Sequence, residues 1–307
     1  MNDTAVEVRN LTVRFGDFIA VNHISFNVRR GEVFGFLGAN GAGKTTTIRV
    51  LCGLLNPSDG FVSVAGASFV DGEQAIKARV GYMSQKFTLY NDLTVEENLN
   101  FAASLRKLDW ENYAKRREEL FKFISFDRSV KVLVRDLPGG TKQQISLCAS
   151  LLHDPEIIFL DEPTSGVTPA ARSRFWALIR KLSERGKTVF VTTHHLDEAE
   201  QCDRIALMRD GKIIALDTPA ALKELTFPMP MLELEPRASM SFTEMSAMGR
   251  PELFLFFEPY GLRFHATIRN EAEWEKSKGL FEEKFKIRKI TPTLEDVFIR
   301  TSEGKFE

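Results

Sequence analysis

Cysteine is scarce in this sequence, and its placement argues against two common kinds of stabilising site. Cys52, Cys148 and Cys202 are odd in number, lie far apart and form no CxxC pair. Neither a disulfide framework nor a zinc centre is therefore indicated. We expect three reduced thiols, as is usual for a cytosolic protein.

Long apolar runs are also absent. No stretch of the sequence approaches the ~20 consecutive apolar residues that a membrane-spanning helix needs. Residues 1–10 are polar and contain no apolar signal core. We therefore expect that, if this protein serves a membrane process, another chain supplies the membrane part.

Charge of one sign is not in excess. Lys and Arg number 41 and Asp and Glu 42, so the net charge is −1. This balance gives no support for a nucleic-acid partner, which usually calls for a basic surface. Hydrophobic residues make up 43% and charged residues 27%, as expected for a globular protein with real cores. The length of 307 residues suggests one large domain and a smaller one.

The first ~225 residues alternate short apolar strands with helical stretches. This pattern is typical of an α/β fold with a mixed, mainly parallel sheet and helices on its faces. Residues 32–37, 156–160 and 188–192 are predicted strands, and a helix is predicted from about residue 44 to residue 55.

A helical insertion is predicted between the first two of these strands. Thr94 and Glu97 form a capping-box pattern, and Asp109 is placed to cap a second helix. We interpret residues 94–126 as part of the insertion and place the whole helical subdomain at about residues 86–155.

The sequence changes character at residues 227–230, Phe-Pro-Met-Pro, where two prolines suggest a domain boundary. The order beyond it is strand, helix, strand, strand, helix, strand, which matches a small α+β, ferredoxin-like unit. The expected strands are residues 231–235, 252–257, 262–268 and 285–290, and the expected helices are residues 239–248 and 271–281. Four side chains are expected in or near the core: Phe254, Phe256, Phe264 and Ile287. A last helix should begin near Thr293. We divide the chain into a first domain, residues 1–225, and a C-terminal accessory domain, residues 226–307, with a regulatory or dimer-contact role.

A P-loop pattern, GxxxxGK[ST], follows the first predicted strand and opens a helix. It reads Gly38-Ala39-Asn40-Gly41-Ala42-Gly43-Lys44-Thr45, with Thr46 next. Glycines let successive backbone N–H groups turn toward phosphate oxygens, and the positive end of the following helix faces the same anion. Lys44 would supply a charge for the β and γ phosphates, and the Thr45 hydroxyl could ligate Mg²⁺. A chance Gly-rich turn is a poor explanation of so long a motif in this context.

Asp161 and Glu162 follow directly after the strand at residues 156–160. The carboxyl end of a strand is the ligand side of an open α/β sheet. Asp161 is placed to hold Mg²⁺, and Glu162 to act as a general base toward water. An ordinary solvated acidic pair is the alternative, and the P-loop favours the functional interpretation.

Four further segments resemble the ATP-binding cassette family. Leu137-Pro138-Gly139-Gly140-Thr141-Lys142-Gln143-Gln144 resembles the family's signature, Tyr82-Met83-Ser84-Gln85 its Q-loop, Ser165-Gly166-Val167-Thr168-Pro169 its D-loop and Thr193-His194 its switch histidine. The resemblance covers roughly residues 5–225. Residues 292–298, Pro-Thr-Leu-Glu-Asp-Val-Phe, resemble the closing motif of cassette subunits from drug, lipid and polysaccharide exporters. Those subunits are separate from their membrane chains.

The resemblance implies roles for individual residues, with ATP and Mg²⁺ as cofactors. Gln85 would contact Mg²⁺ or the attacking water, and His194 would touch the γ-phosphate and orient that water with Glu162. Phe15 occupies the place of the aromatic that stacks on adenine, although a core aromatic is an equal alternative. The adjacent His195 matches no family position and is interpreted as a surface residue. The implied ligands of the metal are Thr45, Gln85 and Asp161, and the implied signature toward the opposite subunit's nucleotide is Pro138, Gly139 and Gly140.

Two departures from the family pattern affect segments that act across a dimer interface. Pro138 replaces the signature serine, and Thr168 replaces the usual aspartate of the D-loop. The implied function is the ATP-hydrolysing subunit of an exporter, peripheral at the cytoplasmic face of the cell membrane. Its implied partners are an integral-membrane permease and a second cassette, in a homodimer or a heterodimer.

Two alternatives remain at this point. A soluble cassette protein acting on ribosomes or DNA usually carries two cassettes, long coiled-coil insertions or basic arms, and none is visible. A regulatory nucleotide-binding module with little turnover is supported by Pro138 and Thr168, but intact Glu162 and His194 argue against it. The cargo is not readable from this sequence, and the chain could be half of a tandem-cassette protein.

Overall fold

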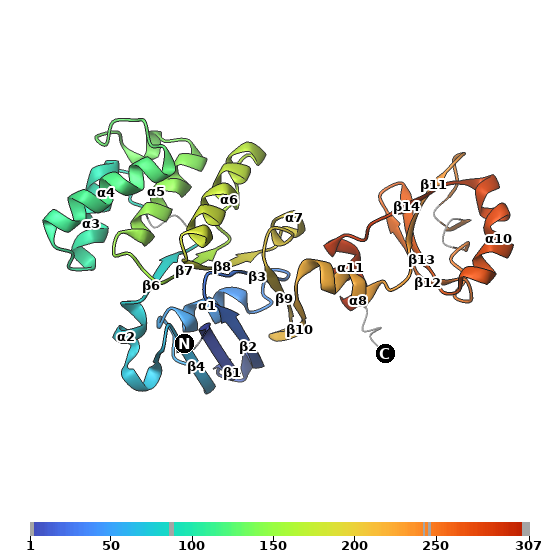
Figure 1. Cartoon of the computed structure of the whole chain (residues 1–307), viewed down its shortest axis with the longest axis horizontal. Coiled ribbons are helices and arrows are strands. Elements are labelled where there is room, and N and C mark those ends of the chain that lie inside the picture. Colours follow the sequence, from blue (N-terminus) through green and yellow to red (C-terminus); the bar gives the residue numbers. More distant parts are fainter. Residues whose placement is uncertain (1–2, 86–88, 242, 245–246, 303–307) are drawn as a thin grey trace. The chain divides into compact units, whose positions relative to one another are not determined.

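The computed structural model describes residues 3–85, 89–241, 243–244 and 247–302. The chain divides into two compact units, Met1–Asp217 and Thr218–Glu307 (Figure 1). This division falls before residue 225, the boundary expected from the sequence, because helix α8 (Pro219–Thr226) contacts α11 (Leu294–Ser302) of the second unit.

The first unit is built on a six-stranded sheet in the order β10-β9-β3-β8-β7-β6. The pairs from β9 to β6 are parallel, whereas β10 pairs antiparallel with β9, so the sheet is mixed and mainly parallel as predicted. Its strands are β3 (Val33–Leu37), β6 (Val80–Met83), β7 (Ile157–Asp161), β8 (Thr188–Thr193), β9 (Arg204–Arg209) and β10 (Lys212–Asp217). Every residue of β3, β7 and β8 is buried, as expected where helices or a second sheet cover both faces.

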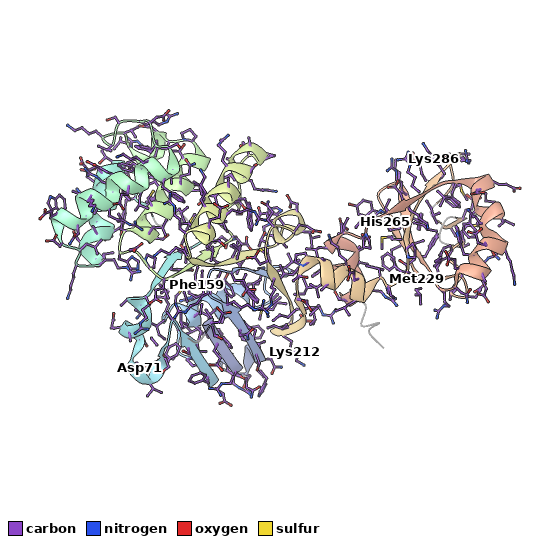
Figure 2. The ribbon with its side chains drawn as sticks, viewed as in Figure 1. Asp71, Phe159, Lys212, Met229, His265 and Lys286 are labelled. Atoms are coloured by element: carbon purple, nitrogen blue, oxygen red, sulfur yellow. The ribbon has the colours of Figure 1, made fainter. Side chains whose placement is uncertain are left out.

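A second, four-stranded antiparallel sheet packs against the first through aromatic side chains. Its order is β2-β1-β4-β5, and its strands are β1 (Thr4–Phe15), β2 (Phe18–Arg29), β4 (Asp59–Val64) and β5 (Ala67–Ser68). Phe26 of this sheet lies 5.3 Å from Phe36 and 6.2 Å from Phe190 between ring centroids. Phe159 belongs to the same core (Figure 2). Helix α1 (Lys44–Leu51) contributes Ile48 to it and ends earlier than the predicted residue 55.

Three helices form the predicted insertion: α3 (Val95–Leu105), α4 (Trp110–Ile124) and α5 (Gly139–Leu151). The Thr94–Glu97 capping box and the Asp109 cap are both present, so those two sequence signals located the helix starts. The remaining helices of the unit are α2 (Glu73–Lys77), α6 (Pro169–Glu184) and α7 (Leu196–Ala199), with short 3-10 turns at Phe69–Asp71 and Val134–Asp136.

The second unit contains an antiparallel sheet in the order β12-β13-β11-β14. Its strands are β11 (Met231–Pro236), β12 (Phe254–Tyr260), β13 (Arg263–Ile268) and β14 (Phe285–Ile290), and α10 (Glu271–Lys284) follows β13. This order and connectivity agree with the predicted ferredoxin-like arrangement. The helix predicted at 239–248 falls partly outside the described residues; Thr243 and Glu244 are helical. The predicted last helix is α11, with Glu295 and Asp296 in its first turn.

Of the four side chains predicted in or near the core of the second unit, three belong to its main apolar cluster or pack against it, and the fourth is buried beside another ring. Phe254 and Phe264 belong to the main cluster, and Ile287 packs against it. Phe256 is buried elsewhere, with its ring 5.2 Å from that of Phe227. Among the described residues no helix is long and apolar enough to cross a membrane.

Candidate nucleotide-binding site

The P-loop connects β3 to α1 and has a backbone that only glycine adopts freely. Gly41 and Gly43 have φ values of 84° and 105°, in the left-handed region. A Cβ on Gly38 would lie 2.3 Å from the carbonyl oxygen of Met208, and one on Gly43 would lie 2.6 Å from that of Ala20. The loop therefore passes too close to its neighbours for side chains at these positions.

Lys44 is held across the loop that precedes it. Its side chain is buried, and its Nζ donates to the carbonyl oxygens of Gly38 over 2.7 Å and Ala39 over 3.0 Å. The same nitrogen lies 3.7 Å from Oε1 of Glu162. Burial lowers the pKa of Lys44, and the nearby carboxylates of Glu162 and Asp161 oppose that shift. The ammonium group thus lies at the loop, beside the acidic end of β7.

Asp161 ends β7 and is almost completely buried. Its Oδ1 accepts hydrogen bonds from Thr45 Oγ1 over 3.1 Å and from Thr192 Oγ1 over 2.6 Å. Burial raises the pKa of Asp161, although both hydrogen bonds oppose the shift. The carboxylate is therefore tied to the first turn of α1 on one side and to β8 on the other.

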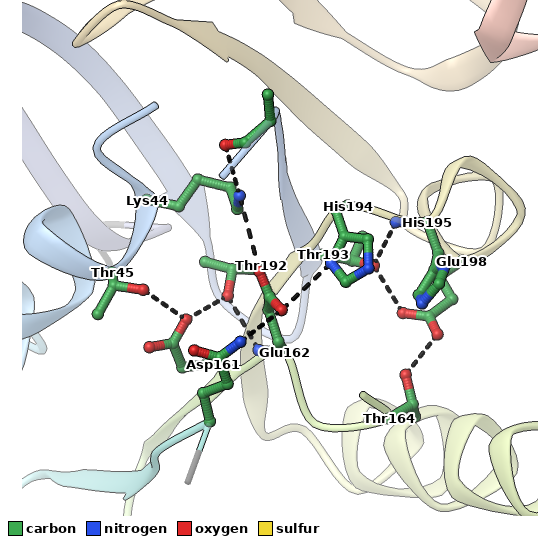
Figure 3. Close-up of polar contacts among 12 residues, drawn as sticks. Lys44, Thr45, Asp161, Glu162, Thr164, Thr192, Thr193, His194, His195 and Glu198 are labelled. Atoms are coloured by element: carbon green, nitrogen blue, oxygen red, sulfur yellow. Dashed lines mark hydrogen bonds and ion pairs between the residues drawn. The ribbon is translucent and has the colours of Figure 1, made fainter. Parts of the chain in front are cut away.

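Glu162 has a strained backbone and several polar neighbours besides Lys44 (Figure 3). Its φ of 47° is unusual for a residue with a side chain, and its N–H donates to the carbonyl and hydroxyl oxygens of Thr192. Its Oε2 accepts from Gln85 Nε2 over 2.8 Å and lies 3.2 Å from His194 Nδ1. Strain of this kind is found where a side chain must be aimed at a functional position.

A cavity of about 430 Å³ opens beside these groups. It is lined by Phe15, Phe18, Ala20, Asn40, Gly41, Gly43, Lys44, Thr45, Thr46, Gln85 and Glu162. Phe15 and Phe18 face each other across the turn between β1 and β2 and are 51% and 64% exposed. Phe15 is therefore no core aromatic. Phe18 and Ala20 were not predicted, and only their position next to Phe15 in the hairpin could have indicated them.

The P-loop residues that do not line the cavity support the loop itself. The carbonyl oxygens of Gly38 and Ala39 accept hydrogen bonds from Lys44, whereas Ala42 is buried in the core.

Among the described residues, no group of three or more His, Cys, Asp or Glu side chains is arranged to hold a metal ion.

The signature residues lie at the start of α5, outside the cavity lining. Pro138 is the N-cap of this helix and makes no side-chain cap hydrogen bond, although its carbonyl oxygen accepts from Thr141 N and Lys142 N. Gly140 packs against α6, since a Cβ there would lie 2.7 Å from that of Ala171. Thr168 caps α6 by accepting from Ala171 N over 3.4 Å. It thus keeps the capping role that an aspartate would have.

A buried network behind His194 was not predicted. His195, expected at the surface, is only half-exposed, and its N–H donates to Thr193 Oγ1 over 2.9 Å. The Thr193 hydroxyl in turn donates to Oε2 of Glu198, which lies in the short helix α7. Sequence spacing gave no signal for this network because it depends on how the chain turns back after β8.

Comparisons with known proteins agree with this geometry. A model of the ABC transporter family matches residues 21–165. The chain is 45% identical over 221 residues to the "Probable multidrug ABC transporter ATP-binding protein YbhF" of Escherichia coli (strain K12), covering 72% of this chain and 38% of that protein. The chain therefore spans well under half the length of that relative.

Two further similarities extend the comparison. The Nod factor export ATP-binding protein I of Neorhizobium galegae is 33% identical over 304 residues, which cover 99% of this chain and 86% of that protein. A dimeric structure of a post-hydrolysis state of an ATP-binding cassette, bound to ADP and Pi, matches with a TM-score of 0.62 and 26% identity. That match covers 69% of this chain and 98% of that one.

Proposed function

The chain belongs to the ABC transporter family, and on this premise we propose that it binds Mg·ATP in the P-loop cavity and hydrolyses it. The single observation that best supports this activity is the placement of Glu162. Its carboxylate is buried beside the P-loop lysine and within 3.2 Å of a histidine. A carboxylate held in this way, next to a phosphate cradle, is suited to act on water rather than to stabilise the fold.

Phosphate binding is supported by the loop and by Lys44. The backbone N–H groups of Gly41 and Gly43, with the N-terminus of α1, would form a cradle for anionic oxygens. Lys44 lies at this cradle, where its Nζ contacts two backbone carbonyl oxygens and lies 3.7 Å from Oε1 of Glu162. We expect its ammonium group to turn from those carbonyl oxygens to the β and γ phosphates when the nucleotide binds.

Thr45 and Asp161 fit Mg²⁺ that arrives with the nucleotide. Their side-chain oxygens are 3.1 Å apart, and Mg²⁺ in nucleotide sites is typically held by one or two carboxylates together with substrate phosphates and waters. Gln85 supplies a further amide close to Glu162. When bound, Mg²⁺ would neutralise charge on the phosphate oxygens.

Glu162, His194 and Gln85 are the proposed catalytic residues. Glu162 would accept a proton from the attacking water, and the imidazole of His194 would orient that water and contact the γ-phosphate. Gln85 would contribute to holding the water, since its amide already donates to Glu162. Phe15, with Phe18 opposite, would stack on the base at the other end of the cavity.

The proposed process is export across a membrane, with the chain as a peripheral subunit at the cytoplasmic face. The names of the multidrug and Nod factor export relatives support this direction. The proposed partners are an integral-membrane permease and a second cassette, and the dimeric cassette structure supports the second of these. ATP would draw the two cassettes together, and hydrolysis would release them.

The second cassette could be another copy of this chain or a different protein. In a homodimer, Pro138 would face both nucleotides and neither would receive a signature hydroxyl. In a heterodimer with a regular signature, the intact Lys44, Glu162 and His194 would serve one fully competent site.

The experiment that tests this function measures ATP binding and hydrolysis by the purified chain and by Lys44→Ala. We expect Mg²⁺-dependent turnover by the wild-type chain and loss of nucleotide binding in the variant. Binding without any turnover would favour the regulatory alternative. Capture of the chain from detergent-solubilised membranes with a polytopic partner would exclude the soluble alternative, and capture with ribosomes or DNA would support it.

A further inference from the structure

One buried carboxylate outside the proposed catalytic set joins two segments of the site. Glu198, in the short helix α7, is 1% exposed. Its Oε1 accepts from Thr164 Oγ1, and its Oε2 accepts from Thr193 Oγ1 over 2.8 Å (Figure 3). A buried carboxylate is costly unless it is paired and hydrogen-bonded, so these contacts hold it firmly in place.

Arg172 of α6 provides the opposite charge. Its Nε lies 3.1 Å from Oε1 of Glu198, and its Nη1 lies 3.3 Å from Oδ2 of Asp197. Its Nη2 is 3.4 Å from Nε2 of His195. Helix α6 begins directly after the loop that follows Glu162, so Arg172 connects that loop to the turn after β8.

The two threonines are placed next to the proposed catalytic pair. Thr164 follows Glu162 by two positions, and Thr193 directly precedes His194. Thr193 Oγ1 also accepts from the N–H of His195, which fixes the turn that carries the imidazole. The two oxygens of Glu198 thus hold together the segments whose side chains meet at 3.2 Å between His194 Nδ1 and Glu162 Oε2.

We propose that Glu198 is a positioning residue for ATP hydrolysis, and this inference rests on the function proposed above. By binding Thr164 and Thr193 with one carboxylate, it keeps the imidazole of His194 within reach of Glu162. It is not among the residues that line the cavity. Small displacements of reacting groups are sufficient to slow an enzyme strongly, so removing this link should reduce turnover and leave nucleotide affinity intact.

The test compares variants that break the link with variants that preserve it. Glu198→Ala removes both hydrogen bonds, whereas Glu198→Gln keeps an acceptor for one threonine and a donor to the hydroxyl oxygen of the other. Thr193→Val removes one hydroxyl at constant shape, and Thr193→Ser restores it. Glu32→Gln is the matched control, since Glu32 is also buried and paired with an arginine, Arg204, at the opposite end of β3.

We expect Glu198→Ala and Thr193→Val to lower kcat at least about tenfold, with the Kd for ATP unchanged within about threefold. Glu198→Gln and Thr193→Ser should have a kcat close to that of the wild-type chain. For Glu198→Gln we expect this even if removal of the ion pair with Arg172 lowers the Tm. Glu32→Gln should lower the Tm without changing kcat. A kcat that follows the Tm across all five variants would overturn the proposal, because it would indicate a purely structural role.

A second measurement does not depend on turnover. The imidazole resonances of His194, identified with a His194→Ala variant, report its surroundings directly. They should move in Glu198→Ala and Thr193→Val and stay in place in Glu32→Gln. If they do not move, the positioning role is wrong. If the wild-type chain shows no turnover while these shifts are observed, the proposed ATPase function fails and the positioning contact stands.

Discussion

The carboxylate of Glu162 and the imidazole of His194 meet at the ends of the neighbouring strands β7 and β8, with 3.2 Å between Oε2 and Nδ1. Because β7 and β8 are parallel and adjacent, residues that follow them must lie on the same edge of the sheet. β3 pairs with β8 on its other side, which brings the P-loop to that edge as well. The arrangement of the proposed site is therefore a consequence of strand order.

The first prediction concerns the aromatic end of the cavity. Phe15→Ala and Phe18→Ala should each weaken ATP binding, since stacking of a base on an aromatic ring contributes about 1–3 kcal/mol. Binding of inorganic tripolyphosphate, which has no base, should be unaffected. Titration of both ligands measures this, with Phe61→Ala as the control because Phe61 lies in β4 outside the cavity lining. Equal weakening of both ligands would show that the rings act on the fold instead.

The second prediction concerns the signature. Pro138→Ser supplies a hydroxyl whose hydrogen bond to a charged phosphate contributes about 1.5–3 kcal/mol, or roughly ten- to a hundredfold in the closed dimer. Serine would also cap α5, which has no side-chain cap now. We expect slow, concentration-dependent turnover by the wild-type chain alone and faster turnover by the variant. Brisk wild-type turnover that serine leaves unchanged would contradict a defect at this position.

The third prediction concerns acid stability of the second unit. Oδ1 of Asp296 lies 2.6 Å from Nδ1 of His265 (labelled in Figure 2), and Oδ2 accepts from Thr293 N and Oγ1. Burial acts to raise the pKa of Asp296, but these hydrogen bonds outweigh it and place the pKa below its ordinary value of 3.8. A carboxyl group with a lowered folded pKa stabilises above its unfolded pKa, and this contribution disappears as the pH falls through the folded pKa.

Asp296→Asn should therefore lower the free energy of unfolding of this unit at neutral pH by about 2 kcal/mol. The difference from wild type should shrink below about pH 4. Hydrogen exchange of the α11 amides across this pH range measures it. Glu295→Gln, an exposed neighbour on the same helix, is the control. A difference that is constant with pH would show that the charge of Asp296 is not the cause.

The proposed site was largely predictable from sequence because its parts are local patterns attached to strands. The GxxxxGK[ST] motif requires a strand, a tight turn and a helix, and the Asp161-Glu162 pair requires only a strand end. Glu198 was not predictable, because its contacts depend on where a four-residue helix places one side chain. Phe18 was not predicted, because an aromatic residue near a hairpin turn has many structural explanations.

The second unit shows where strand alternation fails. Phe254 and Phe256 would share a face in a regular strand, and the sequence prediction placed both in or near the same core. A register shift between these residues in the β12–β13 pairing moves Phe256 to the other face, where it meets Phe227. One extra residue in a ladder reverses every later side chain, and no local pattern in the sequence marks it.

The most direct test of the central claim measures ATP binding and ATP hydrolysis by the wild-type chain and by Glu162→Gln. A general base typically contributes about 10²- to 10⁴-fold to the rate, while Lys44 and the P-loop remain intact in this variant. The account predicts that Glu162→Gln binds Mg·ATP at least as tightly as the wild-type chain and hydrolyses it at least about a hundredfold more slowly. Hydrolysis by Glu162→Gln at the wild-type rate would contradict the assignment of Glu162 and, with it, the proposed mechanism.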